Sequence, residues 1–314
     1  MSGPLPSPAT YNTTPTSGST PDLRGRVCVV TGATRGIGRA AAMRFAQLGA
    51  EVVLVGRDER LLDDARAEAQ RVTKNDRVFW VRADFASLAS VRAVAEEIAH
   101  RWPAIHVLVN NAGVNSARRA ASIDGHEMTL AVNYLAPFLL TTLLVPAIGR
   151  GGTSRIVNVT SIFAHLTRVD RDDLMFERRR YDSTTAYNQS KLAITMFTME
   201  LGERLAVSGI IVNGVSPGLV ATDLMREHSL FTMGWLRPFW RTMLLTPEQA
   251  AERIVRVATS PASGTVTGQC FAGSDRTILV PFGARNAGAR RQLWDLSAQL
   301  TRAPEVSAIA RGDR

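Results

Sequence analysis

The sequence predicts a single α/β domain, in which a parallel sheet of about seven strands is covered by helices on both faces. Three observations support this fold class. Short β-branched runs alternate with longer helical patterns, glycines cluster directly after the first strand-like run, and nothing resembles a linker between residues 25 and 283. Strand–helix alternation places crossover helices on both faces of a parallel sheet. We therefore expect one doubly wound domain over residues 23–283.

The predicted strands are short runs rich in residues that favour strands. They lie at 27–31, 51–56, 77–82, 106–110, 155–161, 210–216 and 269–271. Helical patterns separate them, among others at 38–48, 61–71 and 88–101. In the last of these, Val91, Val94 and Ile98 recur at the spacing of one helix face.

Three further segments complete this outline. Residues 1–22 are rich in Pro, Ser, Thr and Gly and lack the basic start and apolar run of a signal peptide, so we expect a disordered tail. Residues 284–314 are expected to form a C-terminal extension, amphipathic around 293–300 and then polar. The apolar stretch 131–149 contains Asn, Tyr, Pro and Thr residues, and it is predicted to be a buried helix rather than a membrane span.

The composition is that of an ordinary globular enzyme, with 45% apolar and 21% charged residues. The formal net charge is +9, but no basic run interleaved with aromatic residues indicates nucleic acid binding. An arginine-rich protein that holds an anionic cofactor is the preferred interpretation. Cys28 and Cys270 each lie in an apolar strand-like run, which predicts free thiols and a reducing, cytoplasmic location. The histidines and cysteines form no plausible set of metal ligands, so no metal is expected.

A glycine-rich turn, Thr31–Gly38, follows the first predicted strand and opens the first helix. Glycines permit a tight turn there and let the backbone approach a pyrophosphate at the helix N-terminus. The second strand ends in Gly56 and Arg57, where an NAD-binding chain would present an acidic residue to the ribose. Arg57 and Arg35 instead suit a 2′-phosphate, which predicts NADP(H). Asp58 is expected to be a surface charge.

A possible proton-transfer pair follows further along the chain. Tyr187 and Lys191 are four residues apart in a predicted helix and therefore share one face. An ammonium beside a phenol favours the phenolate and lowers a pKa that starts at about 10. Such a pair can move a proton to or from an alcohol near neutral pH. The pattern is weak by itself, and becomes informative downstream of the glycine-rich turn and the strand-end Ser161.

Together these motifs resemble the short-chain dehydrogenase/reductase family, whose fold is the Rossmann fold, over about residues 24–275. The resemblance implies a catalytic tetrad of Asn133, Ser161, Tyr187 and Lys191. In it Tyr187 acts as general acid or base, and Ser161 holds the reacting oxygen. Lys191 binds the nicotinamide ribose, and Asn133 supports a proton-relay water.

The cofactor-binding residues follow from the same resemblance, together with Arg57. It implies that Asp84 and the 110–113 segment serve the adenine, and that the 217–222 segment holds the nicotinamide carboxamide. The full predicted set is Thr31, Gly32, Thr34, Arg35, Gly36, Ile37, Gly38, Arg57, Asp84, Phe85, Asn111, Ala112, Gly113, Tyr187, Lys191, Pro217, Gly218, Val220 and Thr222.

Within the family, the sequence is most similar to the retinol dehydrogenase-like reductases. The likeness is carried by the DGHE sequence at 124–127, the NYLAPF run at 133–138, and the spacing of 26 positions from Ser161 to Tyr187. The charged insert 168–180 between these two residues is predicted to be a flap over the pocket, with a solvated loop as the alternative.

The resulting prediction is an NADP(H)-dependent oxidoreductase that transfers hydride between nicotinamide and a carbonyl or alcohol of a fairly apolar small molecule. Two alternatives stay open, a tailoring ketoreductase of a specialised-metabolite pathway and a catalytically silent NADP(H)-binding sensor or scaffold. The aromatic-rich segment 230–245 is predicted to be an apolar lid, with a core helix as the alternative. A helix over 187–205 that is apolar on more than one face predicts a homo-oligomer, either a dimer or a tetramer.

Overall fold

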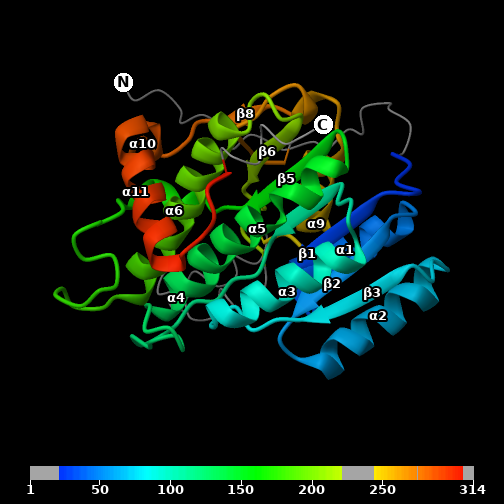
Figure 1. Cartoon of the computed structure of the whole chain (residues 1–314), viewed down its shortest axis with the longest axis horizontal. Coiled ribbons are helices and arrows are strands. Elements are labelled where there is room, and N and C mark those ends of the chain that lie inside the picture. The colour runs from blue at the N-terminus through cyan, green and yellow to red at the C-terminus, as the bar shows by residue number, and fades with distance from the viewer. Residues whose placement is uncertain (1–20, 221–243, 274, 307–314) are drawn as a thin grey trace, which may run out of the picture.

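The computed structural model describes residues 21–220, 244–273 and 275–306. Over these residues one eight-stranded sheet forms the centre, in the order β3-β2-β1-β4-β5-β6-β7-β8 (Figure 1). The strands are β1 (Val27–Thr31), β2 (Glu51–Gly56), β3 (Val78–Arg82), β4 (Val107–Asn110), β5 (Ser154–Val159), β6 (Ile210–Val215), β7 (Gln269–Phe271) and β8 (Thr277–Ile278). The seven predicted strands are confirmed within two residues and pair in parallel, whereas the unpredicted β8 pairs antiparallel with β7.

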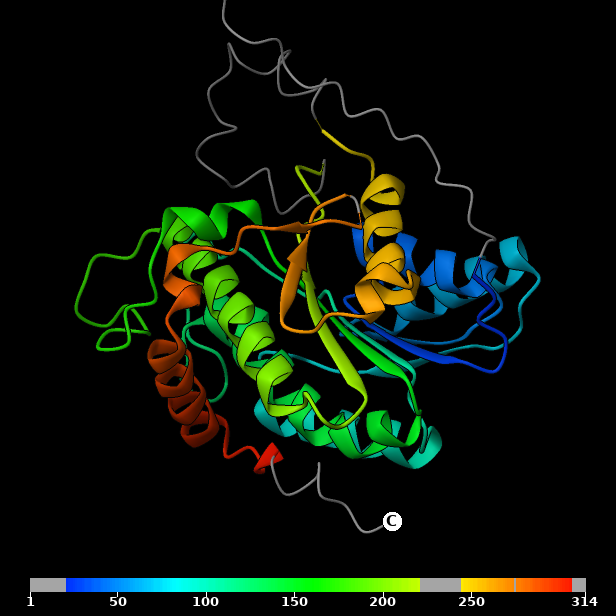
Figure 2. The same cartoon turned by 90° about the horizontal axis from the view of Figure 1, so that it is seen from above.

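Helices cover both faces of this sheet, as predicted (Figure 2). The main ones are α1 (Gly36–Gln47), α2 (Glu59–Thr73), α3 (Leu88–Arg101), α5 (Ala136–Arg150), α6 (Ser183–Arg204), α9 (Pro247–Thr259) and α11 (Ala287–Thr301). Side chains alternate along a strand, so Cys28 and Val30 pack toward α1 and α9 while Val29 packs toward α3, α5 and α6. Both sides are buried, which explains why the strands read as continuous apolar runs.

The order of the strands reverses at β1, which lies between β2 and β4. In an open α/β sheet, the crevice at such a reversal is where ligands bind. Here the ends of β1 and β4 are joined through Thr31, whose hydroxyl donates to the Val109 carbonyl and accepts from the backbone N–H groups of Asn111 and Ala112. The position of the site is therefore fixed by the fold.

The apolar stretch 131–149 is a buried helix, as predicted. It belongs to a continuous helical segment, Met128–Arg150, that comprises the short α4 (Met128–Leu130), a π-helical turn (Ala131–Leu135) and α5. Among the described residues this is the one helical segment long and apolar enough to cross a membrane, and 89% of its apolar window is buried inside the fold. Burial to this extent is typical of a core helix of the fold.

The C-terminal extension packs into the same core through the short α10 (Phe282–Arg285) and α11 (Figure 1). The Trp294 ring stacks on Phe197 with 5.7 Å between centroids and meets Phe138 edge-on at 4.9 Å. Arg290, itself buried, forms ion pairs with Glu200 and Glu203 of α6. The apolar faces of α6 are therefore buried by α11 of the same chain. This removes the reason for expecting a partner subunit there, and the oligomeric state stays a prediction.

Candidate active site

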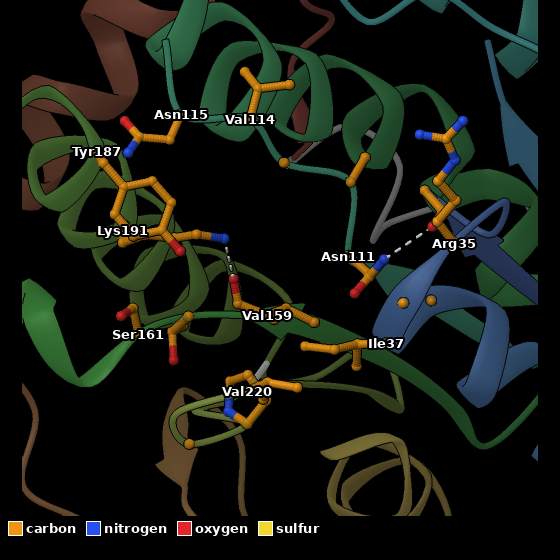
Figure 3. A pocket seen from close by; sticks show the side chains of 18 of the residues that line it. Arg35, Ile37, Asn111, Val114, Asn115, Val159, Ser161, Tyr187, Lys191 and Val220 are labelled. Carbon is orange, nitrogen blue, oxygen red and sulfur yellow. Dashed lines mark hydrogen bonds between the residues drawn. The ribbon is translucent and has the colours of Figure 1, made fainter. Parts of the chain in front are cut away.

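A cavity of about 650 Å³ lies at the carboxyl ends of β1, β4, β5 and β6, where the strand order reverses (Figure 3). Four segments form its walls, namely 32–38, 111–115, 159–163 and 217–220, together with Tyr187 and Lys191 from α6. Figure 3 shows Arg35 at one end and Tyr187 with Ser161 toward the other.

Most of the predicted site residues line this cavity. They are Gly32, Thr34, Arg35, Gly36, Ile37, Gly38, Asn111, Ala112, Gly113, Ser161, Tyr187, Lys191, Pro217, Gly218 and Val220. Thr31, Arg57, Asp84, Phe85 and Asn133 are absent from its lining. Thr222 and all but the last two residues of the predicted lid 230–245 lie outside the described residues.

The glycine-rich turn is built for close backbone approach. Gly32 and Gly36 have φ values of +66° and +54°, in the left-handed region that favours glycine. A Cβ at Gly38 would lie 2.3 Å from the Asn111 amide nitrogen and equally close to the Gly32 carbonyl oxygen. The turn leads directly into the N-terminus of α1, where unpaired backbone N–H groups and the helix dipole favour an anion.

Three predicted cofactor residues have other contacts. The Thr31 side chain is fully buried in the clamp between β1 and β4, so its hydroxyl is turned away from the cavity. Phe85 is buried in the core on the α3 side of the sheet. The Asp84 carboxylate accepts from the Ala86 backbone N–H at 3.0 Å, which fixes the turn before α3.

Two exposed arginines and a capped carboxylate mark the edge of the glycine-rich turn. Arg35 and Arg57 are exposed, and neither guanidinium has an ion-pair partner among the described residues. Asp58 is the N-cap of α2 and accepts from the Leu61 backbone N–H at 3.1 Å. A Cβ at Gly56 would lie 2.9 Å from the Thr34 methyl group, so a longer side chain is excluded there. One oxygen of the exposed Asp58 carboxylate thus serves as the helix cap.

Ser161, Tyr187 and Lys191 converge toward the end of the cavity opposite Arg35 (Figure 3). The Tyr187 phenol and the Ser161 hydroxyl are hydrogen-bonded. The Lys191 Nζ lies 5.8 Å from the centroid of the Tyr187 ring and donates to the Val159 carbonyl at 2.9 Å. Ser161 follows the end of β5 at Val159, and α6 carries Tyr187 and Lys191. The strand and the helix together therefore set this arrangement.

Burial dominates the electrostatics of these three groups. It raises the pKa of the Tyr187 phenol, while the hydrogen bond with Ser161 acts in the opposite direction. Burial also lowers the pKa of the Lys191 ammonium to about 8. The predicted lowering of the phenol pKa is therefore wrong for this structure, because desolvation of the phenolate outweighs the favourable contacts. Burial therefore keeps the Tyr187 phenol protonated near neutral pH.

Asn133 does not line the cavity, but it is hydrogen-bonded to the 113–114 segment that does. Its amide donates to the Val114 carbonyl and to the Ser190 hydroxyl, both at 2.9 Å, and accepts from the Val114 backbone N–H at 2.7 Å. A Cβ at Gly113 would lie 3.3 Å from the Asn133 Oδ1 and 3.8 Å from the Lys191 Nζ. Asn133 thus holds the 113–114 segment against Lys191, and its role toward a relay water stays a prediction.

The charged insert is anchored to the body of the protein. Its Asp173 carboxylate accepts from three backbone N–H groups, at Glu177, Arg178 and Arg179. The Tyr181 hydroxyl donates to the Ser116 carbonyl at 2.9 Å. No residue of the insert lines the cavity, and the insert and the adjoining Tyr181 contact the 116–119 segment from outside. The flap over the pocket stays a prediction.

Sequence reasoning missed part of the cavity wall. The residues missed are Val114, Asn115, Val159, Thr160, Phe163 and Leu219. Each lies within two residues of a predicted site residue, so extending every motif by two positions along its extended backbone would have found them.

Comparisons with known proteins agree with this geometry. The family model for short chain dehydrogenases matches residues 26–231. Retinol dehydrogenase 11 of Homo sapiens is 38% identical over 286 residues, which covers 91% of this chain and 89% of the relative. Polyprenol dehydrogenase of Mus musculus is 38% identical over 294 residues and covers 90% of this chain and 85% of the relative.

Solved structures give the same result. An uncharacterised protein from Mycobacterium paratuberculosis superposes with a TM-score of 0.75 at 29% identity, over 91% of this chain and 96% of the other. A variant of actinorhodin polyketide ketoreductase with NADPH has a TM-score of 0.62 at 27% identity, over 79% of this chain and 95% of the other. The chain therefore belongs to the short chain dehydrogenase family, on its retinol dehydrogenase-like branch.

Proposed function

We propose that this protein is an NADP(H)-dependent oxidoreductase that interconverts a carbonyl and an alcohol on a fairly apolar small molecule in the cytoplasm. The observation that carries the proposal is one cavity with two unlike ends. A glycine-rich turn with Arg35 marks one end, and a phenol, a hydroxyl and an ammonium converge toward the other. The names of the two curated relatives, a retinol and a polyprenol dehydrogenase, are those of alcohol oxidoreductases.

The side chains at the reactive end have distinct tasks. A nicotinamide cofactor, when bound, supplies or accepts the hydride. In carbonyl reduction, Tyr187, which burial keeps protonated, donates its proton to the substrate oxygen. The Ser161 hydroxyl donates a hydrogen bond to the same oxygen, which strengthens as negative charge develops. The nearby Lys191 ammonium stabilises the phenolate that Tyr187 leaves behind.

The other end of the cavity fits a dinucleotide phosphate. The N-terminus of α1 favours the pyrophosphate, and Gly32 and Gly38 let the turn before this helix pack against the 111–112 segment. Arg35 and Arg57 suit a 2′-phosphate, while the nearby Asp58 caps α2 through its Oδ1. The similar ketoreductase structure with NADPH supports the same choice.

A second candidate is a tailoring ketoreductase of a specialised-metabolite pathway, favoured by the structural similarity to a polyketide ketoreductase. The two candidates share their chemistry and cofactor and differ in substrate. A panel of aldehydes and ketones that includes β-keto thioesters therefore distinguishes them. A silent NADP(H)-binding sensor would bind NADPH tightly and reduce no carbonyl of the panel.

Replacing Tyr187 by Phe tests the proposed chemistry. Because the variant lacks the proton donor, we expect its rate of NADPH oxidation to fall by about 10²- to 10⁴-fold on every carbonyl that the wild type reduces. NADPH affinity, measured by fluorescence titration, should stay within about twofold. A variant that keeps its activity would rule out Tyr187 as the proton donor.

Replacing Arg35 or Arg57 by Ala tests the cofactor choice. Each guanidinium is expected to make a charge-assisted hydrogen bond to the 2′-phosphate, so each change should weaken NADPH binding by about tenfold or more. NADH binding should not change. Arg71, exposed in the last turn of α2, provides the matched control Arg71→Ala. Equal affinity of the wild type for NADH and NADPH would contradict the assignment.

A further inference from the structure

The 111–115 segment runs along the cavity from its cofactor end to its reactive end. At its start the Asn111 amide lies against Gly32 and Gly38, and at its middle Gly113 lies against Lys191. Because the backbone continues in the same direction, Asn115 lies beyond Lys191, away from the glycine-rich turn. Figure 3 shows Asn115 near Tyr187, at the end of the cavity opposite Arg35.

Asn115 is an exception among the buried amides of this site. Asn111 and Asn133 use their amide groups in hydrogen bonds to the protein. Asn115 lines the cavity with only 9% of its surface exposed, and neither its Nδ2 nor its Oδ1 has a hydrogen-bond partner among the described residues. A buried amide without partners costs free energy, so such a group calls for an explanation.

The backbone that carries Asn115 is held in place from outside. The Ser116 carbonyl accepts from the Tyr181 hydroxyl, and the Ser116 backbone N–H donates to the Thr129 hydroxyl at 3.3 Å. Arg119, further along, donates to the Met175 carbonyl of the insert. These contacts keep the unpaired amide in the cavity wall next to the proton donor.

We propose that Asn115 is a specificity residue that pairs with a second oxygen group, a hydroxyl on a carbon close to the reacting carbonyl. This inference rests on the proposed function, because it names the class of substrate: hydroxy-carbonyls and the corresponding diols. A hydroxyl matches the amide because it accepts from Nδ2 and donates to Oδ1. A site that hydrogen-bonds a substrate hydroxyl discriminates strongly against the analogue that lacks it, since its own polar group is then left unpaired.

A pair of ketones of equal size tests this inference. In 2-hydroxyacetophenone a hydroxyl replaces the terminal methyl group of propiophenone. The kcat/KM of the hydroxyketone with NADPH is divided by that of propiophenone, in the wild type and in Asn115→Leu. Comparing this ratio between the two proteins cancels the different intrinsic reactivities of the ketones. We expect the ratio to fall by about tenfold or more in the variant, mainly through loss on the hydroxyketone. Asn115→Ala provides a second variant should Asn115→Leu fail to fold.

The matched control is Asn188→Leu. Asn188 is also a buried amide with an unpartnered Oδ1, but it does not line the cavity, so its replacement should leave the ratio unchanged. A ratio that stays the same in both Asn115 variants, or falls equally in Asn188→Leu, would overturn the inference.

A binding measurement separates this inference from the proposed function. Calorimetry compares 1-phenyl-1,2-ethanediol with 1-phenyl-1-propanol on the protein saturated with NADP⁺. Preference for the diol that disappears in Asn115→Leu supports the inference even without turnover, whereas absence of turnover on every carbonyl would contradict the proposed function alone. Equal binding of the two alcohols by the wild type would contradict the inference.

Discussion

The two ends of the cavity are built in different ways. The cofactor end consists mainly of backbone, with glycines that bring the 32–38 turn against the 111–112 segment and a Thr31 hydroxyl that ties the two together. The reactive end consists mainly of side chains, among them Asn115, Phe163 and Tyr187. The cofactor end depends on positions that carry no side chain, and the reactive end depends on side chains that point in a given direction.

This difference has a consequence for substitutions. Adding one methyl group should damage the cofactor end most, because two backbone segments already touch there. Removing one polar atom should damage the reactive end most, because its groups act one by one. The three changes below test this contrast, in order of decreasing expected effect.

The largest effect is expected for Gly38→Ala at the cofactor end. The new Cβ would meet the Asn111 amide nitrogen and the Gly32 carbonyl oxygen at 2.3 Å, so the turn and the 111–112 segment must separate. Overpacking of this kind costs about 1–3 kcal/mol, and if the whole cost falls on the bound state, NADPH affinity drops by about 5- to 150-fold. Fluorescence titration with NADPH measures it.

Gly149→Ala is the matched control, because nothing lies within 4 Å of a Cβ added at this position near the end of α5. Alanine favours a helix by up to about 1 kcal/mol over glycine, so this variant should be at least as stable as the wild type, with unchanged NADPH affinity. Normal NADPH binding by Gly38→Ala would show that the cofactor end tolerates a side chain, and the contrast would fail.

The same contrast explains which parts could be predicted from sequence. The sheet, the glycine-rich turn and the Ser161–Tyr187–Lys191 group were predictable because they depend on local patterns and on chain order. The backbone contacts of Thr31 and Asp84 were not, since a hydroxyl or carboxylate near a site serves equally well to bind a ligand or to hold the backbone. The cofactor contacts of these two residues stay a prediction.

Long-range packing accounts for the other differences. The apolar faces of α6 indicated a partner subunit, but they are covered by α11, about a hundred residues further along the chain. The pKa of Tyr187 was expected to fall because the sequence shows the neighbouring ammonium and not the degree of burial. Asn115 has no motif of its own, and only the fold shows that its amide is buried and unpaired.

The second prediction concerns Lys191, which lies between the two ends. Burial lowers its pKa to about 8 in the folded protein, against 10.5 for a lysine in water. Between these values the unfolded chain binds more protons, so stability rises with pH. Relative to Lys191→Met, the wild type should gain roughly 2 kcal/mol of unfolding free energy from pH 7 to pH 9.5. Urea unfolding at the two pH values measures the gain.

Lys74→Met is the control for this pH effect, because Lys74 is exposed at the C-terminus of α2. The difference in stability between this variant and the wild type should be the same at both pH values. The stability difference between the wild type and Lys191→Met could also be the same at both pH values. The ammonium would then be as well solvated in the folded protein as in the unfolded chain, and the buried position of Lys191 would be wrong.

The smallest effect is expected for Tyr181→Phe, which acts on the reactive end from outside the cavity. The change removes the hydrogen bonds of the Tyr181 hydroxyl to the Ser116 carbonyl and the Glu127 carboxylate, and should cost about 1–2 kcal/mol of stability. Because Ser116 adjoins Asn115, the KM for a carbonyl substrate should rise about two- to fivefold, with NADPH affinity unchanged.

Tyr134→Phe separates this effect from a general loss of stability. The Tyr134 hydroxyl pairs with the Ser297 hydroxyl at 2.7 Å, in the contact between the helical segment of α5 and α11, and does not line the cavity. Its loss should cost a similar amount of stability and leave the KM unchanged. A KM that rises equally in both variants would mean that the reactive end responds to stability in general. A rise confined to Tyr181→Phe would mean that the insert, although outside the cavity, sets the position of the amide in its wall.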